Sequence, residues 1–478
     1  MIRLPGFLVF IFLLFAYGAG AQVEHPADTV VKDYNSYDTV LPKNDFVDTV
    51  HHLVFTQEDS LREKGIYKLD LVKAENERRW IKTQIVNLSS YKMHGRGYVK
   101  DGRDSAARYI LKKLREFKLK PVGADNRWAQ GFAFPVNTFP GRMFLSVNGD
   151  SLSPGIDFII DPASPSYSGE RVNVKAINLS YITDTAAWHS TLGSMDGDHV
   201  YYLQNPDSFC QHVLHIRISQ LATKLPAGCF IIPMRKLTWS VSRETIPATV
   251  FYVDKDVLPR NLKKVTADVN AVLLPHARSE NIIACMPGDV KDSFIVFSAH
   301  YDHLGMMGDT TYFPGASDNA SGIAMLLYLA SYYSKHPQHY TIVFIAFAGE
   351  EAALMGSEFF VTYPMIPLKN IKFLTNIDIM GDATDGVTVV NATENPKQFE
   401  LLQKINEKNK YLPEIRSRGK AANSDHYYFS EAGVPAFFIY SNGGNGFYHD
   451  VYDRAREVTL NHIDDVANLL EDFVKNIR

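Results

Sequence analysis

The sequence predicts an α/β protein with a mixed, mostly parallel sheet flanked by helices, and a smaller β-rich domain inserted into it. From residue 281 onward, apolar runs typical of strands alternate with helical segments, which is the pattern that builds parallel sheets. Between residues 138 and 270 the apolar runs are short and are broken by Pro, Gly and Asp, which favours strand-rich structure. The expected strands of the larger sheet are residues 294–297, 340–347, 371–377 and 434–440.

The first 75 residues are expected to lie outside the folded domains. Arg3 precedes a nearly continuous apolar stretch, residues 4–17, and small residues follow, which predicts a cleavable signal peptide over residues 1–21. An uncleaved anchor is the alternative, although about 20 apolar residues are needed to span a bilayer. Residues 22–75 are expected to form a leader or arm. We therefore expect export to the periplasm or the extracellular space, without stable membrane insertion after cleavage.

The folded part is expected to consist of a main domain, residues 76–137 and 271–478, and an insert, residues 138–270. In the main domain, apolar positions over residues 104–117 recur at helical spacing and predict an amphipathic helix that covers the sheet. The last helix is expected to begin with Thr459 as its N-cap and to bury one apolar stripe.

Charge and cysteine content limit the possible functions and disulfides of the chain. The net charge is −4 and no run of Lys or Arg occurs, so the sequence lacks the basic surface that nucleic-acid binding requires. Three cysteines allow at most one intramolecular disulfide. Either Cys210 pairs with Cys229, or these two and Cys285 are all free thiols.

Five short polar segments of the second half carry the residue types of a two-metal site. Most of them follow a predicted strand directly, and in open α/β sheets ligands gather beyond the carboxyl ends of the strands. A single His or Asp at such a position is more often a solvated loop residue. Mixed imidazole and carboxylate ligands suit zinc, whereas calcium and magnesium prefer oxygen alone. We expect two zinc ions per chain, and the candidate ligands are His300, Asp318, Glu351, Asp378 and His449.

Three acidic residues have distinct expected roles. Asp318 is the candidate for the carboxylate that bridges the two ions, because it lies in a turn that leads into a helix; a plain N-cap is the simpler role. Glu350 and Glu351 are adjacent and are expected to point in different directions, so that one binds metal and one moves protons. Glu350 is the expected general base, which accepts a proton from the metal-bound water and passes it to the leaving amine.

Neighbouring polar residues are expected to orient the ligands. Asp302 is expected to accept a hydrogen bond from the His300 imidazole, and Asp453 one from His449. Two residues are left open between a ligand and a spare polar residue at the rim of the site: His303 and Asp450.

These motifs resemble the dizinc aminopeptidases, zinc exopeptidases related to bacterial leucyl aminopeptidase, glutamate carboxypeptidase, glutaminyl cyclase and the transferrin receptor. The family pattern appears here as His300-x-Asp302, Asp318 to Gly322, Gly349 to Glu351, Asp378, and Tyr448-His449 with Asp453. The resemblance spans about residues 80–478 and implies the zinc-exopeptidase, phosphorylase/hydrolase-like fold with a protease-associated-like insert. It also implies one zinc on His300 and Asp378, the other on Glu351 and His449, both bridged by Asp318, with Glu350 as base.

The resulting hypothesis is an exported dizinc aminopeptidase that removes N-terminal residues from peptides through a metal-bridging hydroxide. A carboxypeptidase of the same fold, a single-zinc enzyme like glutaminyl cyclase and a non-catalytic receptor-like binding module are the alternatives. The binding module predicts missing ligands, and none is missing. A serine hydrolase is disfavoured because the sequence has no Gly-x-Ser-x-Gly motif, and a mononuclear zincin because it has no His-Glu-x-x-His.

Overall fold

The structure is a computed structural model that describes residues 68–123 and 126–477. The predicted signal peptide and residues 22–67 of the predicted leader lie outside the described residues. The chain divides into two units between Arg79 and Trp80. Helix α2 (Lys68–Leu88) begins in the first unit and ends in the second, and every other element below belongs to the second.

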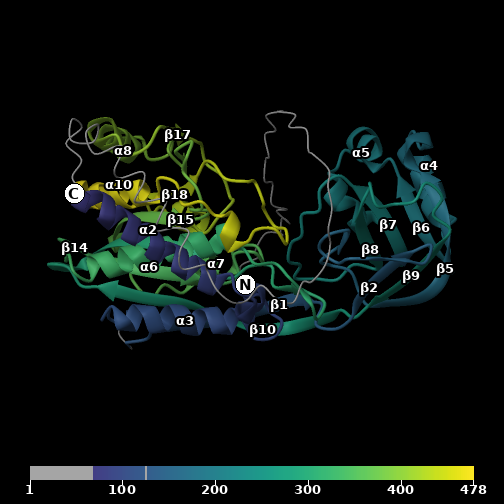
Figure 1. The fold of residues 1–478 in the computed structure, drawn as a ribbon, viewed down its shortest axis with the longest axis horizontal. Helices are drawn as coiled ribbons and strands as arrows, with labels where there is room; N and C mark the ends of the chain where they lie inside the picture. Colours follow the sequence, from purple (N-terminus) through teal and green to yellow (C-terminus); the bar gives the residue numbers. More distant parts are fainter. Residues whose placement is uncertain (1–67, 124–125, 478) are drawn as a thin grey trace, which may run out of the picture. The chain divides into compact units, whose positions relative to one another are not determined.

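An eight-stranded mixed sheet positions the candidate site (Figure 1). Its strands are, in spatial order, β1 (Ala129–Thr138), β10 (Val272–Met286), β14 (Tyr340–Phe347), β11 (Val290–His300), β15 (Ile371–Ile377), β18 (Ala436–Ser441), β16 (Val387–Val390) and β17 (Ile415–Ser417). The central strands β14, β11, β15 and β18 pair in parallel, whereas β1, β10 and β16 join by antiparallel pairing. The predicted fold class is confirmed.

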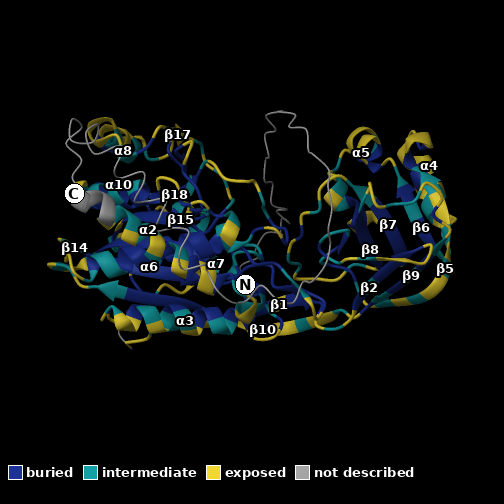
Figure 2. Ribbon diagram, in the orientation of Figure 1, coloured by how far each residue is buried: buried dark blue, intermediate teal, exposed yellow. Residues whose placement is uncertain are grey.

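Alternating side chains explain why the central strands are apolar throughout. In β11, Ile295 and Phe297 pack into the core on one face of the sheet, while Phe294 and Val296 pack into the core on the other. Both faces are therefore covered, and Figure 2 shows these strands as buried. The first core includes residues of α3 (Gly102–Glu116), α6 (Gly322–Tyr333), α8 (Pro396–Asn409) and α10 (Ile463–Asn476), and the second includes residues of α7 (Met355–Thr362) and α9 (His426–Glu431).

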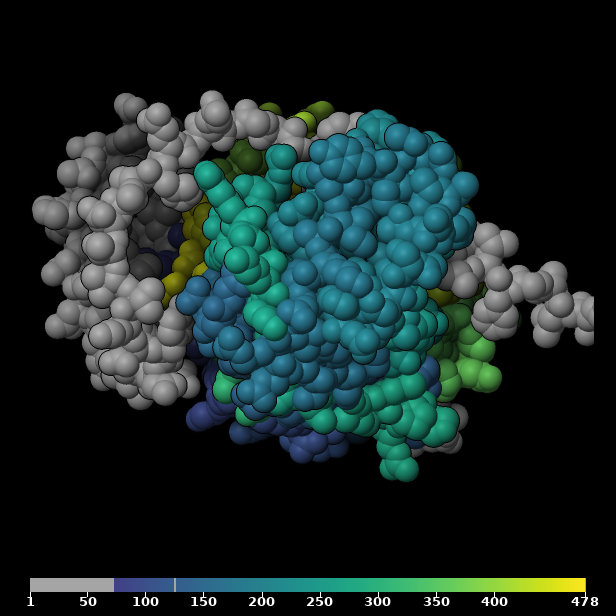
Figure 3. All heavy atoms as spheres, turned by 90° about the vertical axis from the view of Figure 1, so that its right-hand side faces the viewer, coloured from purple at the N-terminus to yellow at the C-terminus, as the bar shows by residue number. Residues whose placement is uncertain are grey.

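A second eight-stranded sheet is built by residues 143–269. Its strands are, in spatial order, β3 (Asp150–Leu152), β2 (Met143–Val147), β9 (Lys264–Val269), β5 (Tyr167–Asn178), β6 (His199–Gln204), β7 (Gly228–Met234), β8 (Ala248–Asp254) and β4 (Phe158–Ile160). Helices α4 (Thr185–Gly193) and α5 (Pro206–Phe209) belong to the same segment, which forms most of the face seen in Figure 3. Its core also takes in Leu304, Met307 and Phe313, which lie in or beside the small sheet of β12 (Met306–Met307) and β13 (Thr311–Tyr312).

Two of the expected strands, 340–347 and 371–377, coincide with β14 and β15. The expected N-cap Thr459 is wrong. Helix α10 begins at Ile463 after His462, which has a left-handed backbone, and the Thr459 hydroxyl donates to Asp382 instead. All three cysteines are free thiols. Among the described residues, none of the helices has the length and apolar character needed to cross a membrane.

Candidate metal centre

The candidate ligands meet beyond the carboxyl ends of adjacent parallel strands. His300 is the last residue of β11, Asp378 follows β15 directly, and Glu351 comes shortly after β14. Asp318 lies in the helical turn Ala316–Ser321 before α6, and His449 in the segment after β18. Because these strands are neighbours in the sheet, residues far apart in the sequence reach one place.

Asp318 lies between the two histidines. Its Oδ1 is 3.3 Å from His300 Nε2, and its Oδ2 is 3.1 Å from His449 Nε2. A second carboxylate completes each half: Asp378 Oδ1 is 3.3 Å from His300 Nε2, and Glu351 Oε2 is 3.2 Å from His449 Nε2. The structure therefore brings the five candidate ligands together as two half-sites that share one carboxylate.

These separations fit zinc. In a tetrahedral zinc site, ligand atoms about 2.1 Å from the ion lie about 3.4 Å from one another, and the four distances above are 3.1–3.3 Å. Asp378 Oδ1 is buried and has no hydrogen-bond partner among the described residues, as expected of an atom that ligates a metal. Zinc is therefore the cation that the donor set and its spacing suit.

The charges of the ligands are mutually dependent. Burial alone raises the pKa of Asp318, but hydrogen bonds from His300 and His449 hold that pKa well below its ordinary value. Burial lowers the pKa of the His300 imidazole, but the facing carboxylates of Asp378 and Glu350 raise it well above its ordinary value. Protons on the imidazoles would therefore compete with a metal, and metal binding would release them.

Glu350 lies at the His300 half of the site. Its Oε2 is 4.0 Å from His300 Nε2. Burial raises the pKa of Glu350 well above its ordinary value, and the Glu351 and Asp378 carboxylates raise it further, against the effect of His300. A buried carboxylate with a raised pKa holds an accepted proton at a higher pH than an exposed one, which suits a general base.

Asp302 supports the site differently from the expectation. The nearest acceptor for His300 Nδ1 is the backbone carbonyl oxygen of Asp302 at 3.1 Å, whereas the Asp302 carboxylate is 3.9 Å away. That carboxylate instead accepts a hydrogen bond from the backbone N–H of Glu350 at 3.2 Å. Asp302 thus contacts the candidate ligand His300 through its backbone carbonyl and the candidate base Glu350 through its carboxylate.

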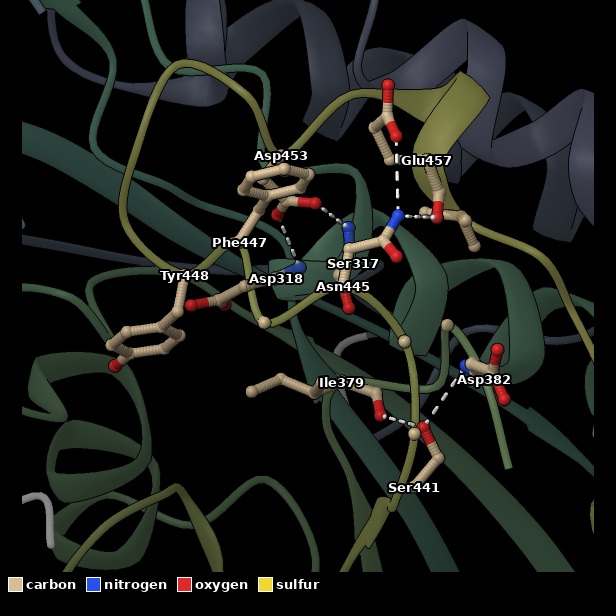
Figure 4. Close-up of a pocket in the computed structure, with 15 residues that line it drawn as sticks. Ser317, Asp318, Ile379, Asp382, Ser441, Asn445, Phe447, Tyr448, Asp453 and Glu457 are labelled. Carbon is tan, nitrogen blue, oxygen red and sulfur yellow. Dashed lines mark hydrogen bonds between the residues drawn. The ribbon is translucent and has the colours of Figure 1, made fainter. Parts of the chain in front are cut away.

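The expectation for Asp453 is wrong. Its carboxylate accepts hydrogen bonds from the backbone N–H groups of Ser317 and Asp318, at 2.8 and 3.0 Å, and so holds the candidate bridging residue (Figure 4). His449 Nδ1 is bound instead by the backbone carbonyl of Trp239 at 2.9 Å. The short spacing between Asp453 and His449 predicts a contact between these two residues, but the Asp453 carboxylate binds the turn before α6 instead.

The two residues left open also have definite places. His303 is fully buried, and its Nδ1 is 2.7 Å from Glu351 Oε1, so it leaves Glu351 Oε2 facing His449. It is not a rim residue. Asp450 accepts a hydrogen bond from the backbone N–H of Tyr452 at 2.7 Å and thereby stabilises the turn after His449.

Two contributors were not found from the sequence. Ser424, just before α9, donates to Asp378 Oδ2 at 3.1 Å. Arg96 is completely buried, and each of its donors meets a backbone carbonyl. The acceptors are Leu88, Tyr301, Pro314, Gly315 and Asp318. The sequence signal for Arg96 was an arginine between two glycines, whereas Ser424 lies in a polar segment that gave no such signal.

Unusual backbone conformations aim several of these side chains. His449 has φ of 56° and Ile379, the residue after Asp378, has φ of 51°. Positive φ is rare outside glycine, and for a β-branched residue it is an outlier of the kind found at functional sites. Gly315 has φ of 56°, and a Cβ there would lie 2.3 Å from the His303 ring. Only glycine fits at that position before Asp318.

A pocket of about 110 Å³ opens beside Asp318 (Figure 4). Ile379, Tyr448 and Val458 give it apolar surface, and Asp382 and Glu457 give it carboxylates. The glycine-rich segment 443–446 forms one wall. Because the pocket includes Asp318 and the neighbour of Asp378, a molecule bound in it lies next to the metal centre.

Part of the chain matches a known peptidase family. Residues 281–474 match the model of peptidase family M28. Aminopeptidase YwaD of Bacillus subtilis strain 168 is 28% identical over 202 residues, which are 40% of this chain and 43% of that protein. A probable zinc metalloprotease of Pyricularia oryzae is 37% identical over 107 residues, which are 22% of this chain and 21% of that protein. The chain thus spans less than half the length of these two relatives.

Solved structures support the fold over a larger part of the chain. A zinc aminopeptidase from Bacillus subtilis superposes with a TM-score of 0.60 at 19% identity, over 83% of this chain and 93% of that one. A peptidase M28 precursor from Shewanella amazonensis SB2B gives a TM-score of 0.60 at 14% identity, over 85% and 97%. At such identities the likeness establishes a shared fold.

Proposed function

On the premise that residues 281–474 belong to peptidase family M28, we propose that this protein is an exported dizinc aminopeptidase. The observation that carries the proposal is the position of Asp318, whose two carboxylate oxygens face His300 and His449 at 3.3 and 3.1 Å. A second carboxylate completes each half. The names of the relatives, which include an aminopeptidase and zinc metalloproteases, support the same reading.

The two zinc ions, when bound, supply the Lewis acidity that lowers the pKa of the attacking water and polarises the scissile carbonyl. His300 and Asp378 would hold one ion, Glu351 and His449 the other, and Asp318 would contribute an oxygen to each. Glu350 accepts the proton of the attacking water at its carboxylate and returns it to the leaving amine. Its burial beside His300 keeps the proton within the site between these two steps.

The pocket beside Asp318 receives the N-terminal residue of the peptide. Its volume of about 110 Å³ suits one side chain of moderate size rather than an extended chain. Its walls combine apolar side chains with carboxylates and, among the described residues that form them, no Lys or Arg. A neutral or apolar N-terminal residue therefore fits better than an acidic one.

The alternatives make different demands. A glutaminyl cyclase-like enzyme with a single zinc needs only one half-site, whereas both halves here have their own histidine and carboxylate. A carboxypeptidase needs a cation for the substrate carboxylate, and the described lining of the pocket carries none. A binding module without catalysis needs no buried base at the position of Glu350.

The remaining parts of the proposal concern the whole chain. Residues 1–21 serve as the signal peptide and residues 22–75 as a leader. The catalytic domain consists of residues 76–137 and 271–478. Residues 138–270, which include the second sheet, form a protease-associated-like insert.

One experiment separates these functions. The purified mature protein is analysed for zinc per chain and then assayed with aminoacyl-anilides, their N-blocked forms and peptides with N-terminal glutamine. We expect two zinc ions, hydrolysis of the free-amine substrates and no reaction of the blocked ones. One zinc together with cyclisation of glutamine would favour the cyclase, and cleavage of blocked peptides from the carboxyl end would favour the carboxypeptidase.

A further inference from the structure

We infer that the inserted segment positions a zinc ligand: the backbone of Trp239 holds His449 in the form that binds the metal. The inference rests on the proposed function, because it concerns the second zinc site. It assigns to residues 138–270 a direct part in building the metal centre. Among the described residues, the partner of His449 Nδ1 comes from the insert and not from the main domain.

Trp239 and His449 are joined by two hydrogen bonds. His449 Nδ1 is 2.9 Å from the carbonyl oxygen of Trp239, and the backbone N–H of Trp239 donates to the carbonyl oxygen of His449 at 3.0 Å. A carbonyl oxygen only accepts, so Nδ1 must carry the proton. In the neutral imidazole Nε2 then has a free lone pair, and Nε2 is the atom that faces Asp318 and Glu351.

The Trp239 side chain anchors this backbone. The side chain is 4% exposed, and its indole N–H donates to the carbonyl oxygen of Ile160 at 2.9 Å. Its ring stacks on Phe313 with centroids 4.7 Å apart and packs against Phe139 at 6.1 Å. Phe313 precedes the turn that carries Asp318, so the ring is fixed between the insert and the bridging segment.

Sheet topology brings the contact to the site. β7 and β8 are neighbouring parallel strands, and such strands need a long crossover connection between them. Here the crossover, residues 235–247, extends to the metal centre instead of forming a helix. Lys236 Nζ also reaches the carbonyl oxygen of Gly446, in the wall of the pocket, at 3.3 Å.

The two zinc-binding histidines are therefore oriented from different places. His300 Nδ1 is held by the carbonyl of Asp302, two residues along the chain. His449 Nδ1 is held by a carbonyl 210 residues away, in the insert. A change in the insert that moves Trp239 should weaken the zinc site of His449 and Glu351 and leave the site of His300 and Asp378 intact.

The test compares two buried tryptophans of the same core. Trp239→Ala removes the anchor beside His449, and Trp188→Ala removes an equally buried ring, 2% exposed, that packs on Phe209 away from the site. Trp239→Phe keeps an aromatic ring against Phe313. Zinc affinities of the full mature chain are measured by chelator competition, and the imidazole N–H protons are observed by NMR of the cobalt-substituted protein.

We expect Trp239→Ala to weaken one of the two zinc sites by about 10- to 100-fold, the usual effect of losing a group that orients a ligand, and to lose one of two protected imidazole N–H signals. Trp239→Phe and Trp188→Ala should keep both sites and both signals. Two unchanged affinities in Trp239→Ala, or equal losses in Trp188→Ala, would overturn this inference alone. A wild-type chain that binds no zinc would overturn the proposed function with it.

Discussion

The guanidinium of Arg96 donates a hydrogen bond to the backbone carbonyl of Asp318 at 3.3 Å, in the turn that carries the candidate bridging carboxylate. The same side chain binds Tyr301, directly after His300, at 2.9 Å and Gly315 at 2.7 Å. One buried cation therefore ties together the two segments that carry His300 and Asp318. Its charge also lies near several carboxylates of the site, although it touches none of them.

Replacing Arg96 should damage both stability and metal binding. Arg96→Met removes a charged donor from five buried carbonyl oxygens, of which that of Gly315 still accepts from the Ala320 N–H. Hydrogen bonds from a charged group are worth about 1.5–3 kcal/mol each. We expect the free energy of unfolding to fall by at least about 3 kcal/mol, measured by urea denaturation. Arg96→Lys keeps the charge but loses the planar guanidinium, so its free energy of unfolding should lie between those of the wild type and Arg96→Met.

The control is Arg260→Met, which removes an arginine from an exposed position. It should change the free energy of unfolding by less than about 0.5 kcal/mol. Equal stability of the two methionine variants would mean that Arg96 does not hold the turn.

Central strands of the first sheet, and the clustering of the candidate ligands at its edge, could be predicted from the sequence. The strands 340–347 and 371–377 were predictable because their continuous apolar runs suit a strand covered on both faces. Ligands gather at the carboxyl ends of parallel strands, and this rule predicts that His300, Glu351 and Asp378 lie at one edge of the sheet.

The supporting contacts were not predictable, for physical reasons. The group that orients His449 is a backbone carbonyl. Every residue type has one, so the sequence does not mark it, and this one lies 210 residues away. Asp453 was expected to bind His449 because it is near in sequence, but the left-handed backbone of His449, with φ of 56°, redirects the chain. Thr459 has the residue type of an N-cap, yet its hydroxyl is bound to Asp382 and the helix begins later.

Glu350→Gln should abolish turnover while both metals stay. The amide has nearly the same shape as the carboxylate but cannot take up the proton of the attacking water. We expect kcat on aminoacyl-anilides to fall by two or more orders of magnitude, with zinc content unchanged at two per chain. Steady-state kinetics and elemental analysis of the same preparation test both parts.

Asp318→Asn is the matched comparison for that variant, since it makes the same chemical change at the bridge. It should lose metal as well as turnover, because in the proposed site this carboxylate serves both ions. Near-normal turnover in Glu350→Gln would remove Glu350 from the reaction.

The charge of the pocket should select against acidic substrates. Asp382 and Glu457 line it, and two like charges 4 Å apart repel by about 1 kcal/mol in water and by more where water is excluded. We expect kcat/KM for an N-terminal leucine substrate to exceed that for glutamate by at least about tenfold. Glu457→Gln should narrow this difference. Equal rates for leucine and glutamate in the wild-type protein would place the substrate side chain elsewhere.

Asp161, in the core of the insert, should make stability depend on pH. Burial raises its pKa above the ordinary 3.8, despite hydrogen bonds from the Ala163 N–H and the Tyr252 hydroxyl. Above pH 3.8 the unfolded chain therefore loses this proton before the folded chain does, and stability falls as pH rises towards the folded pKa. Asp161→Asn cannot titrate, so its free energy of unfolding should rise relative to that of the wild type as pH increases from about 4 to 8.

Urea denaturation across this range measures the difference. The control is Asp256→Asn, which removes the same charge from an exposed position. Parallel pH profiles for the wild type and Asp161→Asn would show that this carboxyl group ionises alike in the folded and unfolded chains.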